Sequence, residues 1–150
     1  MDSFDVAPHM RDLAIAYGLA MPIAWDRERE ERTAGLRTFP LVTIASCGFI
    51  QAAEHLAASS PGILNTTIQG VLAGMGFIGG GTILREGSGV RGTATAASLW
   101  ATAAIGVAVA LGSYDVAIVI SAATFLTLRL PKWRKPSDSA EPSWQQRDRM

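Results

Sequence analysis

Residues 92–114 read GTATAASLWATAAIGVAVALGSY and contain no Asp, Glu, Lys or Arg. Residues 13–25, 38–53, 55–84 and 116–128 are also uncharged, and only 17% of the whole chain is charged. A soluble domain usually has about 25% charged residues, and a soluble amphipathic helix needs a polar face that recurs every 3.6 residues. These five stretches therefore predict helices that lie in a lipid bilayer.

The lengths of the uncharged stretches predict the number of helices. The hydrocarbon core of a bilayer is about 30 Å thick, which takes about 20 helical residues to cross. Helices are expected between Arg11 and Asp26 and over residues 39–56, 63–84, 94–112 and 114–130. The predicted fold class is an all-α integral membrane protein, a bundle of about five transmembrane helices. Four spans are the alternative, in which the first helix only lies in the membrane interface.

The basic residues predict how such a bundle is oriented. With five spans, one face holds 12 of the 13 Lys and Arg residues: Arg27, Arg29, Arg32, Arg37, Arg85, Arg91, Arg129, Lys132, Arg134, Lys135, Arg147 and Arg149. The opposite face holds Arg11 alone. Because basic loops stay in the cytoplasm, we expect the N-terminus outside and the C-terminus inside.

The composition also predicts how the chain is divided. We expect residues 1–130 to form the transmembrane domain. Residues 131–150 are rich in Pro and Ser, which is typical of a disordered segment, so we expect them to form a disordered cytoplasmic tail.

Several classes of protein and site are disfavoured by the composition. The net charge is zero, so the chain lacks the basic footprint of a nucleic-acid-binding protein. A single cysteine, Cys47, excludes an intramolecular disulfide and is expected to pack as a small apolar residue. His9 and His55 are far apart in the sequence and lack the spacing of zinc ligands. No nucleophile–base pair can be assembled, and we expect no metal, no cofactor and no catalytic residue.

The third predicted helix contains the glycine-rich sequence GMGFIGGG at residues 74–81. Read literally, it matches the GxGxxG dinucleotide fingerprint, but that motif needs a preceding strand and a later acidic residue. Gly70 and Gly74, and then Gly76 and Gly80, are spaced four apart and expose backbone for close helix packing. Together with Gly79 they are the candidates for a packing face. The alternative is a kinked or broken helix that lines a polar cavity.

The fourth predicted helix carries hydroxyl groups among many alanines. Thr95, Ser98 and Thr102 recur at about one-turn spacing, which is typical of residues that join helices. The lining of a polar pathway is the alternative. Trp100 lies too deep for an interfacial anchor, so its indole N–H is expected to find a partner inside the bundle.

The sequence DREREER at residues 26–32 follows the first predicted helix. It is expected to form a solvated helix with pairs such as Glu28 with Arg32. Asp26 lies at the membrane boundary, where a carboxylate is costly unless it is paired. The basic residues predicted on the same face are its candidate partners: Arg37, Arg85 and Arg91.

Four sequence blocks resemble the MgtC/SapB family of membrane proteins in order and spacing, over about residues 12–130. They are WDRE at 25–28, AGLRT at 34–38, GMGFIGGG at 74–81 with ILR at 83–85, and VRG at 90–92 with TAASLWATAAIG at 95–106. The resemblance places the family's acidic residue on Asp26 or Glu28, and its arginines on Arg37, Arg85 and Arg91. Thr33, Phe39 and Thr93 depart from the usual pattern.

The resemblance also implies a function. It implies a multi-pass protein of the bacterial inner membrane, associated with growth in low magnesium and survival inside macrophages. Some members are associated with restraint of the proton-translocating ATP synthase, which makes another integral membrane protein the implied partner; a homo-oligomer is also considered. The soluble C-terminal domain of longer members is expected to be absent.

Three function classes follow. The leading hypothesis is a non-enzymatic membrane protein that acts through helix contacts with another membrane complex, in adaptation to low magnesium, acid stress or virulence. The second is a transporter or channel for Mg²⁺ or H⁺, with Asp26, Glu54 and the hydroxyls of the fourth helix along the path. An enzyme is the weakest hypothesis, because no catalytic constellation is present in the sequence.

Overall fold

The computed structural model describes residues 6–30, 34–57, 60, 62–86 and 89–130. Within these residues the chain forms helices joined by short connections and one small hairpin. The tail expected over 131–150 lies outside the described residues, and so do residues 31–33 with Arg32, the expected partner of Glu28.

The described elements agree with the predicted helices to within a few residues at most ends. They are α1 (Val6–Arg29), α2 (Thr38–Ala57), α3 (Ile63–Gly81), β1 (Leu84–Glu86), β2 (Gly89–Arg91), α4 (Thr93–Ala110) and α5 (Tyr114–Arg129). The prediction of five helices is confirmed for the described part of the chain. α1 extends further than expected at both ends and continues through Pro22.

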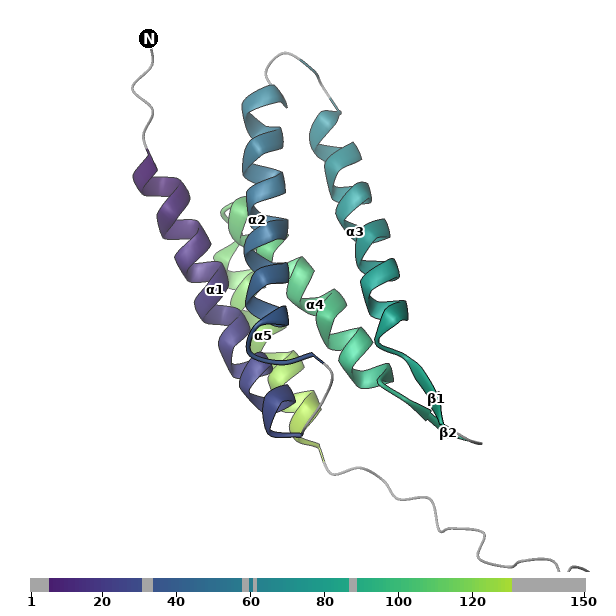
Figure 1. Cartoon of the computed structure of the whole chain (residues 1–150). Coiled ribbons are helices and arrows are strands. Elements are labelled where there is room, and N and C mark those ends of the chain that lie inside the picture. Colours follow the sequence, from purple (N-terminus) through teal and green to yellow (C-terminus); the bar gives the residue numbers. More distant parts are fainter. Residues whose placement is uncertain (1–5, 31–33, 58–59, 61, 87–88, 131–150) are drawn as a thin grey trace, which may run out of the picture.

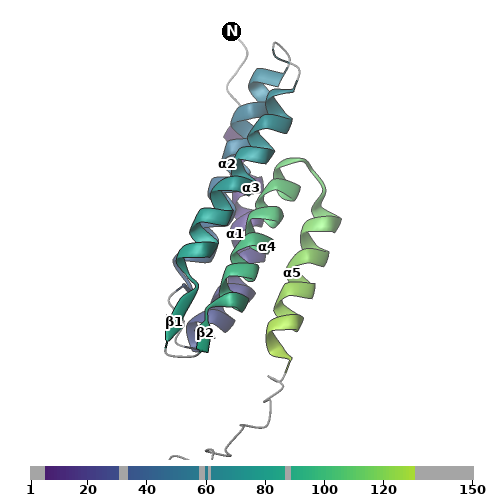
Figure 2. The same cartoon turned by 90° about the vertical axis from the view of Figure 1, so that its right-hand side faces the viewer.

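Successive helices run in opposite directions and form a bundle around α4 (Figures 1 and 2). α4 packs against each of the other four helices, and α1 packs against α2, α4 and α5. α1 is therefore a full member of the bundle.

The alternation of direction brings the basic segments together. The end of α1, the start of α2, the β1–β2 hairpin and the end of α5 all lie at one end of the bundle (Figure 1). We call this end the arginine end, defined by its described arginines: Arg27, Arg29, Arg37, Arg85, Arg91 and Arg129. Arg11 lies near the opposite end, in the second turn of α1. The expected segregation of basic residues is thus a property of the fold.

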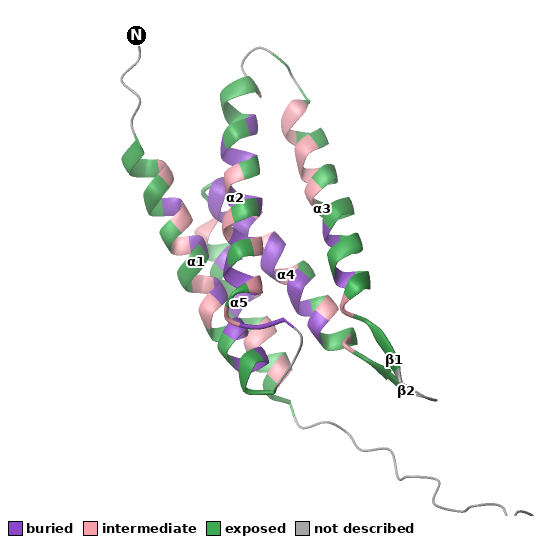
Figure 3. Cartoon of the chain, in the orientation of Figure 1, coloured by how far each residue is buried: buried purple, intermediate pink, exposed green. Residues whose placement is uncertain are grey.

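The core is formed where α1, α2 and α4 meet. Its largest fully buried side chains include Phe39, Ile23, Ile50, Leu99, Ile105 and Val109. α4 has buried residues on nearly every turn, whereas the only buried residues of α3 are Met75 and Gly79 (Figure 3). Because apolar burial is the main stabilising term in folding, α4 is the central element and α3 is a peripheral one.

A glycine in a left-handed conformation forms the connection between α4 and α5. Gly112 has φ of +70° and follows α4, and the N–H groups of Ser113 and Gly112 donate to the carbonyls of Ala108 and Val109 at 2.9 and 3.0 Å. This pattern is a Schellman motif, which favours glycine because the residue just after the helix end, here Gly112, must be left-handed. It allows α5 to begin at Tyr114, directly after the turn.

The β1–β2 hairpin was not predicted from the sequence. Leu84 pairs with Arg91 and Arg85 with Val90 in antiparallel register. Gly92, with φ of +90°, follows the hairpin, and a Cβ there would overlap the carbonyl oxygen of Thr82. The hairpin and this glycine bring the end of α3 against the start of α4.

The length and apolar composition of a helix decide whether it could cross a bilayer. Of the described helices, α4 alone is both long and apolar enough to cross a bilayer by these criteria, and 56% of it is buried inside the bundle. The described structure therefore shows an all-helical bundle with a central apolar helix.

Candidate functional site

A buried ionic cluster lies at the arginine end. Asp26 and Arg27 are 7% and 2% exposed. Nη2 of Arg27 donates to Oδ2 of Asp26 at 2.7 Å and lies 3.6 Å from Oε2 of Glu30. Nε of Arg129, in the last turn of α5, lies 3.0 Å from Oδ1 of Asp26. These four residues, the Asp26 cluster, give each oxygen of the buried carboxylate a guanidinium partner and join α1 to α5.

The sequence correctly singled out Asp26 but not its partners. Because Asp26 faces the interior and α5, it reaches its neighbour Arg27 and the distant Arg129, whose guanidinium also lies 4.8 Å from the centre of the Phe125 ring. The basic residues that were predicted as partners are exposed instead: Arg37, Arg85 and Arg91. The expectation of a solvated helix is also wrong for Arg27, which is buried.

Glu28, the second acidic candidate, is exposed and fixes the connection that leads to α2. Its Oε2 accepts a hydrogen bond of 3.0 Å from the backbone N–H of Leu36. A Cβ on Gly35 would overlap the carboxylate of Glu28, so glycine at this position leaves room for that contact. The role that the structure gives Glu28 is to position this connection.

A second polar cluster, the Asp12 cluster, lies towards the opposite end of α1. Oδ1 of Asp12, which is 8% exposed, accepts hydrogen bonds from Nε of Arg11 at 2.9 Å and from the Tyr114 hydroxyl at 2.8 Å. Nη2 of Arg11 also donates to the Tyr114 hydroxyl at 2.9 Å. Gln51 of α2 lies beside Asp12, and its Nε2 is buried without a completed hydrogen bond among the described residues.

Sequence reasoning missed the Asp12 cluster. Its members are separated by up to 103 positions, and Asp12 was not singled out in the sequence. The same fold brings His9 and His55 together, with ring centroids 5.3 Å apart, although they are far apart in the sequence. Among the described residues, no group of three His, Cys, Asp or Glu side chains is placed to hold a metal ion.

The glycines of α3 do not form the packing face that was predicted within this chain. α3 is a continuous helix, so the broken-helix alternative is wrong. A Cβ on Gly79 would meet Ala96 of α4 at 3.6 Å, an ordinary contact. A Cβ on Gly74, Gly76 or Gly80 would have no described atom within 4 Å. The packing prediction therefore holds for Gly79 and is wrong, inside the chain, for the other three.

The closest helix approach occurs instead at Gly106 of α4. A Cβ there would overlap the carbonyl oxygen of Thr43 and lie 3.0 Å from Cβ of Ser46 and 3.1 Å from the backbone N of Cys47. Gly106 therefore lets the backbones of α2 and α4 meet, which is the contact that small residues permit between helices.

Buried hydroxyl groups of α2 and α4 bond to their own helices, whereas Ser121 of α5 donates to the Leu19 carbonyl of α1 at 2.7 Å. Ser98 donates to the Thr95 carbonyl at 2.9 Å, Thr102 to the Ser98 carbonyl at 2.5 Å, and Thr43 to the Phe39 carbonyl at 2.9 Å. Thr95 is buried, as expected for a helix contact. Trp100 is 51% exposed, so the expectation that its indole lies inside the bundle is wrong.

Along α1, apolar side chains separate the two clusters. Along α1, the buried residues between Asp12 and Asp26 are Ala16, Ala20, Ile23 and Ala24. The clusters are 14 residues apart, or about 21 Å along a helix. The described structure therefore has ionic contacts at both ends of α1, and between them lie apolar side chains of α1 and a hydrogen bond of 2.7 Å from the Ser121 hydroxyl of α5 to the Leu19 carbonyl.

The fold and these contacts define a small, all-helical bundle that holds its ionisable groups near its ends. The chain belongs to the MgtC family, whose model matches residues 13–135. This confirms the resemblance seen in the sequence blocks.

Individual relatives agree with this assignment. The chain is 40% identical to Protein MgtC of Salmonella typhimurium (strain LT2) over 121 residues, which is 81% of this chain and 50% of that protein. It is 38% identical to Protein SrpB of Synechococcus elongatus over 128 residues, which is 77% of this chain and 70% of that protein. The chain thus spans about half the length of the MgtC proteins it matches. No solved structure matches it.

Proposed function

We propose that this chain is a non-enzymatic, multi-pass protein of the bacterial inner membrane, with five spans, the N-terminus outside and the C-terminus inside. It acts by helix contacts with another integral membrane protein in adaptation to low magnesium, acid stress or virulence. Membership of the MgtC family supports the setting, and the arginine end supports the orientation. The ATP synthase is the candidate partner that the family resemblance suggests.

The observation that carries the contact hypothesis is the outer face of α3. Gly76 and Gly80 are spaced four apart, as in a small-xxx-small helix-docking motif, and neither would meet a described atom through an added Cβ. Phe77 beside them is 87% exposed. A helix that exposes a glycine face and a large aromatic side chain is suited to packing against a helix of another protein.

The transport hypothesis has less support. The interior between the Asp12 and Asp26 clusters is apolar along α1, and the buried hydroxyls of α4 bond to their own helix. Glu54 is exposed. These contacts favour a structural role for the buried polar groups over a transport role.

The orientation is tested with fusions to a reporter enzyme that is active only in the periplasm. Fusion at Ser60 should give an active reporter, and fusions at Ser88 and Ser137 should give inactive ones, since basic segments are retained in the cytoplasm. An active reporter at Ser88 would contradict the five-span, N-out arrangement.

The contact hypothesis is tested by affinity purification from native membranes, with identification of the proteins that copurify. Gly76→Leu should abolish copurification of an integral membrane partner while the variant melts like the parent, because the leucine blocks the outer face of α3 and clashes with nothing in the chain. Gly18→Leu is the matched control, since Gly18 of α1 is equally open. If the partner copurifies equally with both variants, the outer face of α3 is not the contact surface.

A further inference from the structure

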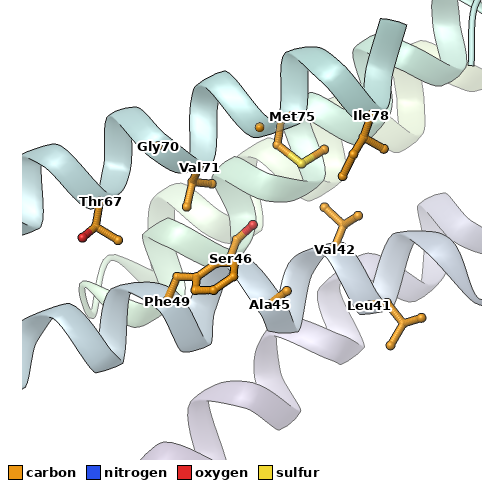
Figure 4. Close-up of a pocket in the computed structure, with 11 residues that line it drawn as sticks. Leu41, Val42, Ala45, Ser46, Phe49, Thr67, Gly70, Val71, Met75 and Ile78 are labelled. Atoms are coloured by element: carbon orange, nitrogen blue, oxygen red, sulfur yellow. The ribbon is translucent and has the colours of Figure 1, made fainter. Parts of the chain in front are cut away.

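An open groove lies between α2 and α3 (Figure 4). Its volume is about 520 Å³, within the range of ligand-binding pockets. Apolar side chains from both helices line it, among them Leu41 and Phe49 of α2 and Val71 and Ile78 of α3. Gly70 and Gly74 form part of its α3 wall, and nothing lies within 4 Å of a Cβ added to either.

The dimensions of the groove favour a hydrocarbon chain as its occupant. Leu41 and Phe49 are eight positions apart, which corresponds to about 12 Å along a helix, slightly less than half of a hydrocarbon core of about 30 Å. An acyl chain is an apolar ligand that can extend over this length, and one leaflet supplies it at this depth.

Two exposed arginines, Arg37 and Arg85, lie beyond the end of the groove that faces the arginine end. The backbone N–H of Leu41 donates to the Arg37 carbonyl at 3.4 Å, so Arg37 precedes the groove by one helical turn. Arg85 follows the other wall, after the end of α3. Both side chains are exposed, and neither makes an ion pair within the described ranges. These arginines lie at the level where the headgroup of a lipid in the groove would be placed.

We propose that the α2–α3 groove binds one acyl chain of an anionic phospholipid of the inner leaflet, with the phosphate held by Arg37 and Arg85. This inference rests on the proposed membrane orientation, in which the arginine end is cytoplasmic. It assigns Gly74 and Arg37 to lipid binding, whereas Gly76, about 200° away around α3, belongs to the proposed protein contact. Substitutions at Gly74 and at Gly76 therefore test the two proposals independently.

Native mass spectrometry of the full chain in detergent tests the proposal, with phosphatidylglycerol and phosphatidylcholine of identical acyl chains as probes. We expect one lipid per protein and a preference for phosphatidylglycerol of about thirtyfold, because each of the two arginines contributes about 1 kcal/mol near a membrane surface. Arg37→Ala should reduce the preference to about fivefold. Arg29→Ala, which removes a charge at the same end but away from the groove, should retain it.

Variants of α3 test the acyl-chain site. Gly74→Leu should fill the groove and abolish retention of both lipids, while Gly76→Leu should bind them like the parent. Equal affinity for the two lipids, or unchanged retention by Gly74→Leu, would overturn the proposal. A dimer without bound lipid would overturn it in favour of a second copy of the chain. Lipid binding by Gly76→Leu together with loss of its protein partner would show that the two proposals stand separately.

Discussion

Gly106→Ala should lower the melting temperature of the bundle more than any alanine substitution at an open glycine of α3. The added Cβ would overlap the Thr43 carbonyl oxygen and press on Ser46 and Cys47. The first and third of these contacts involve backbone, which cannot rotate away. Inserting a methyl group into a well-packed core costs about 1–3 kcal/mol, and we expect the upper part of this range because α2 and α4 would have to separate.

The single cysteine provides a direct measurement. Cys47 is fully buried, so its reaction with a fluorescent thiol reagent during heating reports opening of the α2–α4 contact. Helical circular dichroism, recorded on the same samples, reports unfolding of the whole bundle. Gly76→Ala is the matched control, because it makes the same chemical change at an open position. Equal melting of the two variants would show that the approach at Gly106 is not tight.

The helices and their alternation could be predicted because they depend on local composition. Charge-free stretches of helical length and the short connections between them predict five antiparallel helices, and antiparallel packing places the basic segments at one end. The helix boundaries were less accurate. α1 continues past Asp26 to Arg29, since a paired charge can be buried inside a helix and does not have to end it.

The contacts between helices could not be predicted in the same way. A glycine that separates two touching backbones, such as Gly106, has the same local sequence signal as one that faces outwards, such as Gly76. Which role applies depends on the rotation of each helix about its axis, and the uncharged sequence of α4 does not fix that rotation. The exposure of Trp100 was misjudged for the same reason.

The polar clusters show a related limit. Asp26 was identified because a carboxylate at a membrane boundary needs a partner, but its partner Arg129 is more than 100 positions away in the chain. Asp12 follows Arg11, and the pair looks like an ordinary helix end in the sequence. Only the packing of α1 against α5 brings Tyr114 to Asp12. The resemblance to a family added position-specific information about Asp26 and Glu28, but it did not supply their partners.

Asp26→Ala should destabilise the bundle by about 3–5 kcal/mol, because removing one partner of a buried ion pair leaves the other charge uncompensated. Arg27 would be left 2% exposed, with Glu30 at 3.6 Å as its remaining ion-pair partner among the described residues. Asp26→Asn should cost less, since the amide oxygen can still accept a hydrogen bond. Arg129→Ala should cost least, because the side chain of Arg129 is 52% exposed and Arg27 would still neutralise Asp26.

The same variants separate a structural role for Asp26 from a role in ion transport. Abundance in membranes and thermal unfolding in detergent are measured for each, together with magnesium and proton flux in reconstituted vesicles. Asp115→Ala, at an exposed carboxylate of α5, is the control for loss of an acidic side chain. The structural role predicts that abundance and melting fall in the order of the three substitutions while no variant alters flux. A transport role predicts normal abundance and melting with loss of flux in both Asp26 variants. That second result would overturn the assignment of the Asp26 cluster to architecture, since a carboxylate that binds two guanidinium groups to hold α1 against α5 cannot be removed without weakening the fold.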